Sequence, residues 1–405
     1  MRVLVVGSGA REHALAWRLG LDGADVVVAP GNGGTPANAP LSAGDVGGLA
    51  DVAARERFDL TVVGPEGPLA AGLVDTFSAQ NLPVFGPSKQ AARLEWSKAW
   101  AKAFLVRYGI PTGTAEIVVG QAEARRVISR TGLPVVIKAD GLAGGKGVFV
   151  IDSAEEVDEA LRQCQAFGEC MLIEECLSGP ELSVLAFADG ERLALMPPAR
   201  DYKRVFDGDR GPNTGGMGGR SWPSDATSEL LEFVEQRVLR PTLDGMAAEG
   251  VPYRGVLYAG LMLTADGPRV LEFNCRLGDP ECQLILPLLD SSLLEVLCSA
   301  AAGRLEQPRW RKAQTFGVVL ASAGYPEAPR TGDSITGLDA LPPGVHAFHA
   351  GTAVEDGDLV TAGGRVMTLV SESRADVYAA AERVNFSGKH FRRDIGLEAA
   401  VAATR

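Results

Sequence analysis

The stretch VLEFNCR, residues 270–276, decides how the rest of this chain is interpreted. Alternate side chains of an extended strand share a face, so Leu271 and Phe273 are expected to point into a core. The polar side chains expected on the opposite face are Glu272, Asn274 and Arg276. A carboxylate and an amide oxygen suit Mg²⁺, and a guanidinium beside them suits a phosphate oxygen. The stretch therefore predicts a strand edge that holds a metal ion and a phosphate.

A glycine-rich turn upstream, residues 138–147 (KADGLAGGKG), predicts a second half of the same site. It is not a Walker A loop, because Asp140 stands where the first glycine is required and Gly147 where the hydroxyl is required. Its backbone amides can close over phosphates, and Lys138 and Lys146 supply positive charge. An ordinary glycine-rich hairpin is the alternative. Together the two stretches predict a nucleotide held between a glycine flap and a metal-bearing strand.

The bulk properties limit the class of protein. A chain of 405 residues is expected to form two to four domains. The formal net charge of -12 disfavours a nucleic-acid binder but is compatible with a local positive pocket. No signal peptide or bilayer-spanning segment is expected. Six cysteines without a C-x-x-C pair favour free thiols in a reducing cytoplasm.

The order of apolar segments predicts a mixed α/β and α+β multidomain fold. Residues 1–98 alternate between buried strands and helices, which is typical of a doubly wound parallel sheet. Residues 99–305 form the central part, with a small flap lobe at about 112–188, a helix at 153–164 capped by Ser153, and an irregular loop at 197–223. Residues 306–405 have short strands and many turns, which indicates a β-rich C-terminal domain.

Three further stretches are candidates for binding. Residues 173–181 end a strand near a turn, where free backbone groups can bond an adenine edge and Glu181 a ribose, although paired glutamates are usually only a solvated face. Residues 201–218 combine cations with glycines, which fits a small anionic or zwitterionic substrate. The initial G-x-G at residues 7–9 lacks the third glycine of a dinucleotide site, since Glu12 stands there. It leaves a phosphate at the helix N-terminus, helped by Arg11, as an expectation.

Other chemistries find less support in the sequence. His346 and His349 lack the i, i+4 spacing of a zinc site. No G-x-S-x-G motif occurs, and no cysteine has an activating local context. The absence of an obvious nucleophile fits a reaction in which ATP itself activates the substrate.

Motifs along nearly the whole chain resemble the glycinamide ribonucleotide synthetase (phosphoribosylamine–glycine ligase) family of ATP-grasp enzymes. The motifs that carry the resemblance are GSGAREHA at 7–14, PGNGGT at 30–35, VVGPE at 62–66, SKAWAKAFL at 97–105, IKADGLAGGKGV at 137–148, GPNTGGMG at 211–218, EFNCRLGDPE at 272–281, GYP at 324–326, RTGD at 330–333 and GGRV at 363–366. The resemblance implies an N-terminal α/β domain, two central ATP-grasp lobes and a C-terminal β-rich domain.

The resemblance also implies a reaction in purine (IMP) biosynthesis. ATP, glycine and 5-phosphoribosylamine would give glycinamide ribonucleotide, ADP and phosphate through glycyl phosphate. ATP and Mg²⁺ or Mn²⁺ are the expected cofactors, in the cytoplasm, with no nucleic-acid or membrane partner. A monomer is compatible with the sequence, which does not fix the oligomeric state.

Each expected ligand has its own set of candidate residues. The metal ligands are Glu272 and Asn274. The catalytic residues are Arg276, Lys146, Asp201 and Lys203. The ATP-binding residues are Lys102, Lys138, Asp140, Gly141, Gly144, Gly145, Lys146, Gly147, Glu174, Glu175, Cys176, Leu177 and Glu181. The substrate-binding residues are Gly9, Arg11, Asn213, Thr214, Gly215, Gly216, Met217 and Arg276.

Three rival functions are kept as alternatives. The nearest is another ATP-grasp carboxylate–amine ligase or a carboxylase of purine biosynthesis, which the GPNTGGMG loop disfavours. A nucleotide-regulated binding protein without turnover would be expected to lack Glu272, Asn274 or Arg276. An NAD-dependent oxidoreductase is disfavoured by Glu12.

Overall fold

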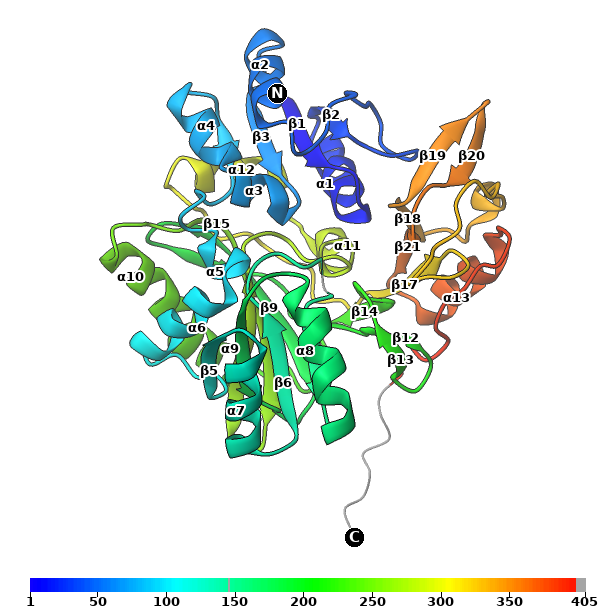
Figure 1. Ribbon diagram of the computed structural model, residues 1–405. Coiled ribbons are helices and arrows are strands. Elements are labelled where there is room, and N and C mark those ends of the chain that lie inside the picture. The colour runs from blue at the N-terminus through cyan, green and yellow to red at the C-terminus, as the bar shows by residue number, and fades with distance from the viewer. Residues whose placement is uncertain (145, 398–405) are drawn as a thin grey trace.

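The computed structural model describes residues 1–144 and 146–397, and its N-terminal part is built around a parallel sheet (Figure 1). The strands, in the spatial order β2-β1-β3-β4, are β1 (Arg2–Gly7), β2 (Asp25–Pro30), β3 (Leu60–Val63) and β4 (Val84–Phe85). The helices between them are α1 (Ala10–Leu21), α2 (Val46–Arg55), α3 (Glu66–Ala71) and α4 (Leu73–Ala79). Residues 3–6 of β1 are fully buried, as a strand inside a covered parallel sheet requires. The predicted parallel α/β fold of this part is confirmed.

The small lobe is an antiparallel sheet covered on one face by two helices. Its strands, in the order β5-β8-β6-β7, are β5 (Ala115–Val119), β8 (Cys170–Glu175), β6 (Val135–Ala139) and β7 (Val148–Ile151). Helices α7 (Gln121–Thr131) and α8 (Val157–Gln165) pack on it through Ile128 and Leu161. The predicted cap is wrong, because Ser153 makes no capping hydrogen bond and a 3₁₀ turn (Ala154–Glu156) precedes α8.

One large sheet runs from the predicted metal strand into the C-terminal part. Its main path is β16-β15-β9-β11-β14-β17-β21-β18, and β10 pairs with β9. The strands are β9 (Glu181–Asp189), β10 (Leu193–Leu195), β11 (Ala199–Asp201), β14 (Gly218–Ser221), β15 (Arg254–Thr264), β16 (Gly267–Asn274), β17 (Phe316–Ala321), β18 (His346–His349) and β21 (Arg365–Ser371). The β-rich C-terminal part therefore has no separate main sheet; its strands extend the central one.

The joint between the two halves of this sheet requires glycine. A Cβ on Gly218 would collide with the carbonyl oxygen of Gly317 in β17, and one on Gly219 with the carbonyl oxygen of Arg200 in β11. Gly218 also has φ +132°, which other residues rarely adopt. The last glycines of the GPNTGGMGG run thus serve the sheet itself.

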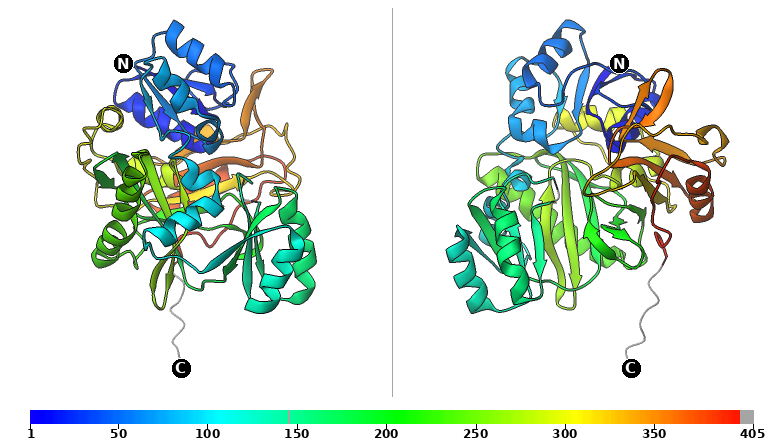
Figure 2. Two further views of the ribbon diagram at one scale, coloured as in Figure 1. Left: turned by 60° about the vertical axis from the view of Figure 1, so that its left-hand side comes forward. Right: turned by 45° about the vertical axis from the view of Figure 1, so that its right-hand side comes forward.

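The large sheet is covered on both faces near β9 and β15. The helices of the central part are α5 (Arg93–Trp96), α6 (Lys98–Arg107), α9 (Ser228–Val234), α10 (Arg240–Ala248), α11 (Glu281–Ile285) and α12 (Leu293–Ala301), with a π-helical turn (Glu235–Leu239) joining α9 to α10 and a 3₁₀ turn (Leu286–Leu288) following α11. One face packs against α6, α9 and α10, and the other against α11, α12 and α1. In two further views the N-terminal part and the small lobe lie at opposite ends of the molecule (Figure 2).

The prediction of an irregular loop at residues 197–223 is wrong. It holds β11, β14 and a hairpin of β12 (Arg204–Phe206) and β13 (Arg210–Asn213). Each strand has three or four residues, too few for a hydrophobic period to show in the sequence. The C-terminal part adds the hairpin β19 (Thr352–Glu355) and β20 (Asp358–Thr361), the 3₁₀ turn Leu338–Ala340 and helix α13 (Arg374–Arg383).

A β-bulge corrects the face assignment of the metal strand. Gly260 pairs with Glu272 and Leu261 with Val270, so Leu271 has no partner of its own in β15. Val270 and Phe273 are therefore the core residues, at 0% and 2% exposure, whereas Leu271 is only partly buried. The bulge leaves the Leu271 carbonyl oxygen to accept a hydrogen bond from Lys138 Nζ at 3.1 Å.

Candidate active site

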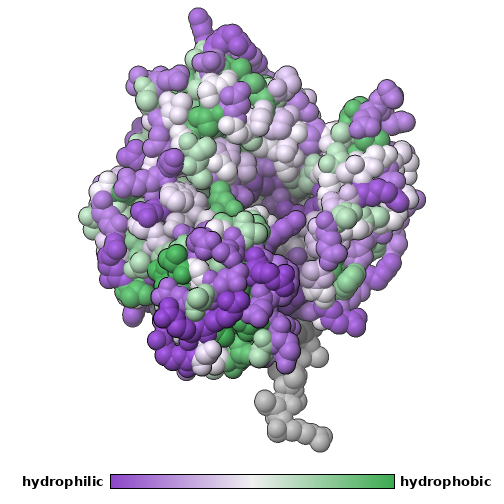
Figure 3. Space-filling model, in the orientation of Figure 1, coloured by the Kyte–Doolittle hydropathy of each residue, from purple (hydrophilic) through white to green (hydrophobic). Residues whose placement is uncertain are grey.

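Glu272 and Asn274 stand at the end of β16. In the space-filling view, hydrophilic side chains border a hollow between the N-terminal part, the small lobe and the C-terminal part (Figure 3). Burial would raise the pKa of Glu272, but Lys203, Lys98 and Lys138 lower it overall. Among the described residues, no side chain lies within ion-pair or hydrogen-bond distance of its carboxylate. An ionised, uncontacted carboxylate is therefore available for a ligand.

Arg276 is held between the N-terminal part and the central part. Its Nη2 lies 2.9 Å from Glu95 Oε1 and donates to Asn274 Oδ1 at 3.0 Å, and its Nε lies 3.3 Å from Glu66 Oε2. The second Glu95 oxygen accepts from the Cys275 amide at 2.8 Å. Burial raises the pKa of Glu95 although Arg276 opposes it. Arg276 thus fixes the orientation of the Asn274 amide.

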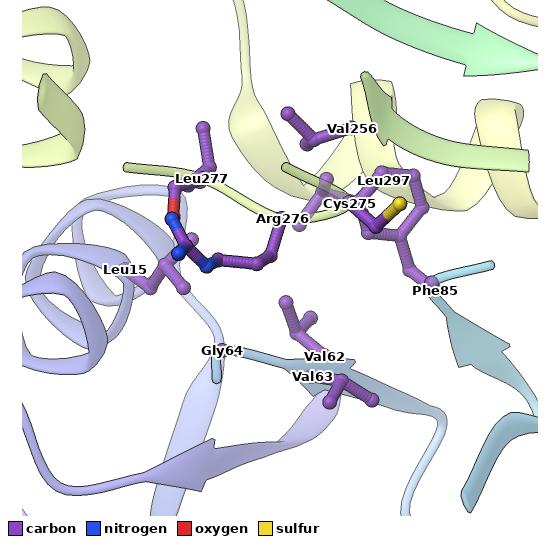
Figure 4. A pocket seen from close by; sticks show the side chains of 11 residues that line it. Leu15, Val62, Val63, Gly64, Phe85, Val256, Cys275, Arg276, Leu277 and Leu297 are labelled. Atoms are coloured by element: carbon purple, nitrogen blue, oxygen red, sulfur yellow. The ribbon is translucent and has the colours of Figure 1, made fainter. Parts of the chain in front are cut away.

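The cavity beside Arg276 is apolar and is not a nucleotide site (Figure 4). Side chains from the N-terminal sheet and the central part surround it, including Val62, Phe85, Val256 and Leu297. Arg276 extends across one side of the cavity toward Leu15 of α1 (Figure 4). The cavity therefore belongs to the contact between the two parts.

Two lysines of the nucleotide set share one carboxylate in the small lobe. Lys102 Nζ contacts Glu174 Oε1, and Lys138 Nζ contacts Glu174 Oε2. Lys102 also donates to Thr112 Oγ1 at 2.6 Å and to the Gly113 carbonyl oxygen at 3.0 Å. Burial lowers the pKa of Lys102 below its usual value despite Glu174. The Glu174 carboxylate therefore faces these lysines, and its role in binding ATP stays a prediction.

Two other acidic residues predicted to bind ATP have structural partners. Asp140 Oδ1 accepts from the Ala99 amide at 3.1 Å and from Ser97 Oγ at 3.2 Å, and so caps the start of α6. Glu175 accepts from the Thr114 amide and hydroxyl, both at 3.0 Å. Their carboxylates hold the flap and β8 in place.

The remaining nucleotide candidates lie at the end of β8 and in the turn between β6 and β7. Cys176 and Leu177 follow β8 and are partly exposed, while Gly141, Gly144, Lys146 and Gly147 form the turn between β6 and β7, with Lys146 exposed. Gly145 lies outside the described residues. Lys98, which sequence reasoning missed, donates to the Gly141 carbonyl oxygen at 3.4 Å and acts electrostatically on Glu272.

Asp201 and Lys203 act on each other electrostatically, and Lys203 also acts on Glu272. Lys203 Nζ donates to Glu181 Oε2 at 2.5 Å, and the predicted contact of Glu181 with a ribose stays a prediction. Burial, with Glu281 and Glu181 nearby, raises the pKa of Asp201 to about 7 even though Lys203 opposes it. Glu281 itself is buried and accepts from Tyr258 Oη at 2.7 Å and from Ser183 Oγ at 3.0 Å.

The predicted substrate loop is fixed from both ends. Thr214 Oγ1 donates to the Lys203 carbonyl oxygen at 2.7 Å, and the exposed Asn213 ends β13. Arg365 Nη1 donates to the Gly215 carbonyl oxygen at 2.6 Å. Met217 is a correction: its side chain is fully buried with Val205 and Ala321, so it cannot contact a substrate.

The G-x-G turn meets the GDPE turn, residues 278–281. The Gly9 amide donates to Glu12 Oε2 at 2.6 Å, and Arg11 Nε donates to Glu12 Oε1 at 2.5 Å. Arg11 Nη1 also donates to the Leu277 carbonyl oxygen at 3.2 Å. The Glu12 carboxylate thus binds the Gly9 amide and Arg11 at this helix N-terminus, and a phosphate there stays a prediction. Gly216 lies near this turn, since a Cβ there would meet Pro280 Cδ at 2.8 Å.

Sequence reasoning missed the residues that support this site, namely Glu66, Glu95, Lys98, Glu281 and Arg365. Four of them lie inside motifs quoted above: VVGPE, SKAWAKAFL, EFNCRLGDPE and GGRV. That placement was the available signal. Glu95 lies outside every quoted motif, and no local pattern marks it.

Family models match nearly the whole chain. The phosphoribosylglycinamide synthetase N domain matches residues 1–95, the ATP-grasp (A) domain residues 96–282 and the C domain residues 315–398. Phosphoribosylamine–glycine ligase of Ralstonia nicotianae is 46% identical, over 98% of this chain and 99% of that protein. The human trifunctional purine biosynthetic protein adenosine-3 is 45% identical, over 98% of this chain and 42% of that protein.

Solved structures show the same fold. The crystal structure of phosphoribosylamine–glycine ligase from Thermotoga maritima is 38% identical with a TM-score of 0.85, covering 98% of this chain and 100% of that one. Biotin carboxylase from Campylobacter jejuni has a TM-score of 0.72 at 16% identity, covering 96% and 92% of the two chains, and shares the fold alone.

Proposed function

The chain belongs to the phosphoribosylglycinamide synthetase family and catalyses the ATP-dependent ligation of de novo purine biosynthesis that forms glycinamide ribonucleotide; from this premise we propose how its residues perform the reaction. Three reacting molecules, ATP, glycine and 5-phosphoribosylamine, must meet at one place. We place that meeting point at the end of β16, where Lys98, Lys138 and Lys203 act electrostatically on Glu272.

The observation that supports this location is the uncontacted carboxylate of Glu272. Lys98, Lys138 and Lys203 all act electrostatically on this carboxylate. A carboxylate among several cations suits a metal ligand beside a polyphosphate. Among the described residues no cluster of three or more His, Cys, Asp or Glu could hold a metal ion alone. A divalent cation, Mg²⁺ or Mn²⁺, would thus bind Glu272 and Asn274 and take its other ligands from ATP oxygens and water. When bound, it neutralises charge on the β- and γ-phosphates.

The protein residues position the phosphates. Lys102 and Lys138 bind phosphate oxygens from the small-lobe side, and Lys146 closes over them with the backbone of the glycine turn. Arg276, fixed by Glu66 and Glu95, faces the transferred phosphoryl group and orients Asn274. Cys176 and Leu177 border the adenine. The positions of the charges, more than covalent chemistry, lower the barrier.

Glycine binds beside Asp201 and Lys203. The zwitterion has an ammonium group for a carboxylate and a carboxylate for an ammonium group, and this pair supplies both. The glycine carboxylate attacks the γ-phosphate of ATP to give glycyl phosphate and ADP. The amine of phosphoribosylamine then attacks the acyl carbon, loses a proton, and inorganic phosphate leaves. Asn213, Thr214, Gly215 and Gly216 line the phosphoribosylamine side, next to Gly9.

The test follows one oxygen atom. Glycine labelled with ¹⁸O in its carboxylate should transfer one labelled oxygen to inorganic phosphate, because the C–O bond breaks when the amide forms. Unlabelled phosphate would overturn the acyl phosphate route. ATP turnover should also require glycine and phosphoribosylamine together.

The cellular setting is proposed on the same premise. We place the enzyme in the cytoplasm, where it would act without a nucleic-acid or membrane partner. In the described part of the chain, no helix has the length and apolar character needed to cross a bilayer. A mass measurement in solution would test whether a monomer is the working form.

A further inference from the structure

A C-terminal segment, residues 390–396 (HFRRDIG), lies against the β12–β13 hairpin of the substrate loop. Its first residue pairs with β17, since the His390 and Ala321 backbones bond each other in both directions at 2.8 and 2.9 Å. From that fixed point the segment runs along the hairpin. Nothing in the proposed reaction uses it.

Arg392 is the centre of this contact. Only 1% of this residue is exposed, which is unusual for an arginine. Its Nε and Nη2 form a bidentate pair with Asp394, at 2.7 and 2.6 Å. Its Nη1 donates to Asp209 Oδ1 at 2.7 Å and to the Arg204 carbonyl oxygen at 3.1 Å, both in the hairpin. One guanidinium thus ties the C-terminal segment to the first strand and to the turn of the hairpin.

Neighbouring bonds repeat the attachment. The Gly208 amide at the hairpin tip donates to Asp394 Oδ2 at 2.8 Å, and the Arg393 amide donates to Asp207 Oδ1 at 2.7 Å. His390 Nε2 lies 2.8 Å from the Val205 carbonyl oxygen. Burial would raise the pKa of Asp394, but Arg392 and Gly208 lower it to about 2. The contact is therefore charged and intact at neutral pH.

The hairpin needs such a support. Only Val205 is buried in its two strands, and all four residues of β13 are exposed. A lone two-stranded ribbon with so little apolar burial is marginally stable in water. The hydrogen bonds from the C-terminal segment supply the missing stabilisation.

Tyr202 connects this support to the active site. The Arg392 guanidinium lies over the Tyr202 ring at 5.1 Å, and the Gly396 amide donates to Tyr202 Oη at 3.2 Å. Successive side chains of an extended chain point to opposite sides. Asp201 and Lys203, the neighbours of Tyr202, accordingly interact with Glu181 on the side of the active site.

We propose that the C-terminal segment, through Arg392, is a positioning device for the substrate loop, and that it sets the affinity for glycine and phosphoribosylamine. This inference rests on the proposed roles of Asp201 and Lys203. The hairpin begins directly after Lys203 and ends at Asn213 beside Thr214, so holding the hairpin fixes both ends of the loop. ATP binding, which uses the small lobe and β16, is independent of Arg392.

The experiment compares Arg392→Gln with Val377→Ala in the full-length enzyme. Val377 of α13 is fully buried in the C-terminal hydrophobic cluster with residues of β17 and β21, and the described members of that cluster include no residue of β12 or β13. Arg392→Gln should raise the KM for glycine and for phosphoribosylamine by about tenfold, because misplaced groups bind weakly, and leave the KM for ATP unchanged. Amide hydrogen exchange at residues 204–213 should quicken in Arg392→Gln only. Asp209→Asn, whose side chain is largely exposed, should shift the same constants less and serves if Arg392→Gln fails to fold.

Two outcomes would overturn the proposal. One is an unchanged KM for both substrates in Arg392→Gln or, where that variant does not fold, in Asp209→Asn. The other is an equal rise in Val377→Ala, which would mean general loosening of the C-terminal part. Asp201→Asn separates this inference from the proposed function: full activity in Asp201→Asn removes the site assignment itself, whereas loss of activity there with normal constants in Arg392→Gln removes only the positioning role.

Discussion

Two buried charge clusters border the site, and their compositions are opposite. Where α6 meets the small lobe, two lysines, Lys102 and Lys138, share the single carboxylate of Glu174. At the end of β16, two carboxylates, Glu66 and Glu95, hold the single guanidinium of Arg276. The first cluster has a surplus positive charge and the second a surplus negative charge.

The surplus charge of each cluster determines which charged ligand it can bind. A polyphosphate arriving at the lysines supplies the anions that Glu174 alone cannot. The carboxylate pair instead fixes Arg276 before any ligand binds, and the surplus negative charge of this cluster favours a cation beside it. The comparison predicts that the lysine cluster depends on its ligand, whereas the arginine cluster does not. Four experiments test this difference, and they follow in order of decreasing expected effect.

Glu272→Gln removes the uncontacted carboxylate that lies between the two clusters. We expect kcat to fall by about 10⁴-fold, or about 5 kcal/mol, because the divalent cation loses its charged protein ligand. Steady-state ADP formation measures the loss, and circular dichroism should show an unchanged fold. Asp266→Asn, an exposed change in the turn of the same hairpin, is the control. Undiminished turnover in excess Mg²⁺ would remove Glu272 from the metal site.

Glu174→Gln leaves Lys102 and Lys138 buried without their shared anion. We expect the free energy of unfolding to fall by about 3 kcal/mol, since an unpaired buried charge is costly. Saturating ATP should restore a larger part of the stability in this variant than it adds to the parent. Urea titrations with and without ATP measure both effects. Glu175→Gln, which loses only bonds to Thr114, is the matched control. Equal stability of parent and variant without ATP would contradict the ligand-dependent cluster.

Arg276→Lys tests the opposite cluster. One ammonium cannot span Glu66, Glu95 and Asn274 as the guanidinium does. We expect kcat to fall by about 10²-fold, or about 2.7 kcal/mol, with ATP failing to offset the loss. Arg269→Lys on the same strand, which loses only a bond to the Thr112 carbonyl oxygen, should keep its rate. A parental rate in Arg276→Lys would refute the role of the planar fork.

His13 offers an uncharged contrast to both clusters. Burial, and His349 nearby, lower its pKa to about 3, and burial lowers that of His349 to about 4. Above pH 6.5 these groups are neutral in folded and unfolded chains, so they contribute no pH dependence. Below pH 6.5, His13 is protonated in the unfolded chain but stays neutral in the folded chain. The free energy of unfolding therefore falls by about 1 kcal/mol per pH unit because of His13. Urea titrations between pH 7 and 5 should show a shallower fall in His13→Gln, and identical slopes would contradict this assignment.

Local patterns predicted much of this architecture, and their failures have physical reasons. The buried strands of the N-terminal sheet and the β15–β16 hairpin follow directly from apolar runs and a turn. The alternation rule failed at Leu271, because a bulge adds one residue and its position depends on pairing with β15. The short strands within residues 197–223 are defined by their partners in the sheet, which a local window does not contain.

The sequence predicted the residues proposed to face the ligands better than the residues that hold those side chains in place. Glu272, Lys138 and Lys203 carry charges whose chemistry is visible in the sequence. Glu95 lies 180 residues from Cys275, whose amide it binds, and that contact exists only because α5 packs against β16. Met217 was likewise predicted to bind the substrate, because its motif does not reveal that its side chain packs with Val205 and Ala321.

The pairing of β14 with β17 has a consequence for anyone who would divide this chain. Cutting the protein near residue 305 would strip β14 of one neighbour and bare a row of backbone donors and acceptors. Such a fragment would expose an unpaired edge strand that can pair with other chains. We therefore expect the fragment to aggregate rather than to fold as a smaller ATP-binding protein. The strands of the last hundred residues cover the edge of the large sheet at β14, so the enzyme has to be expressed and engineered as one chain.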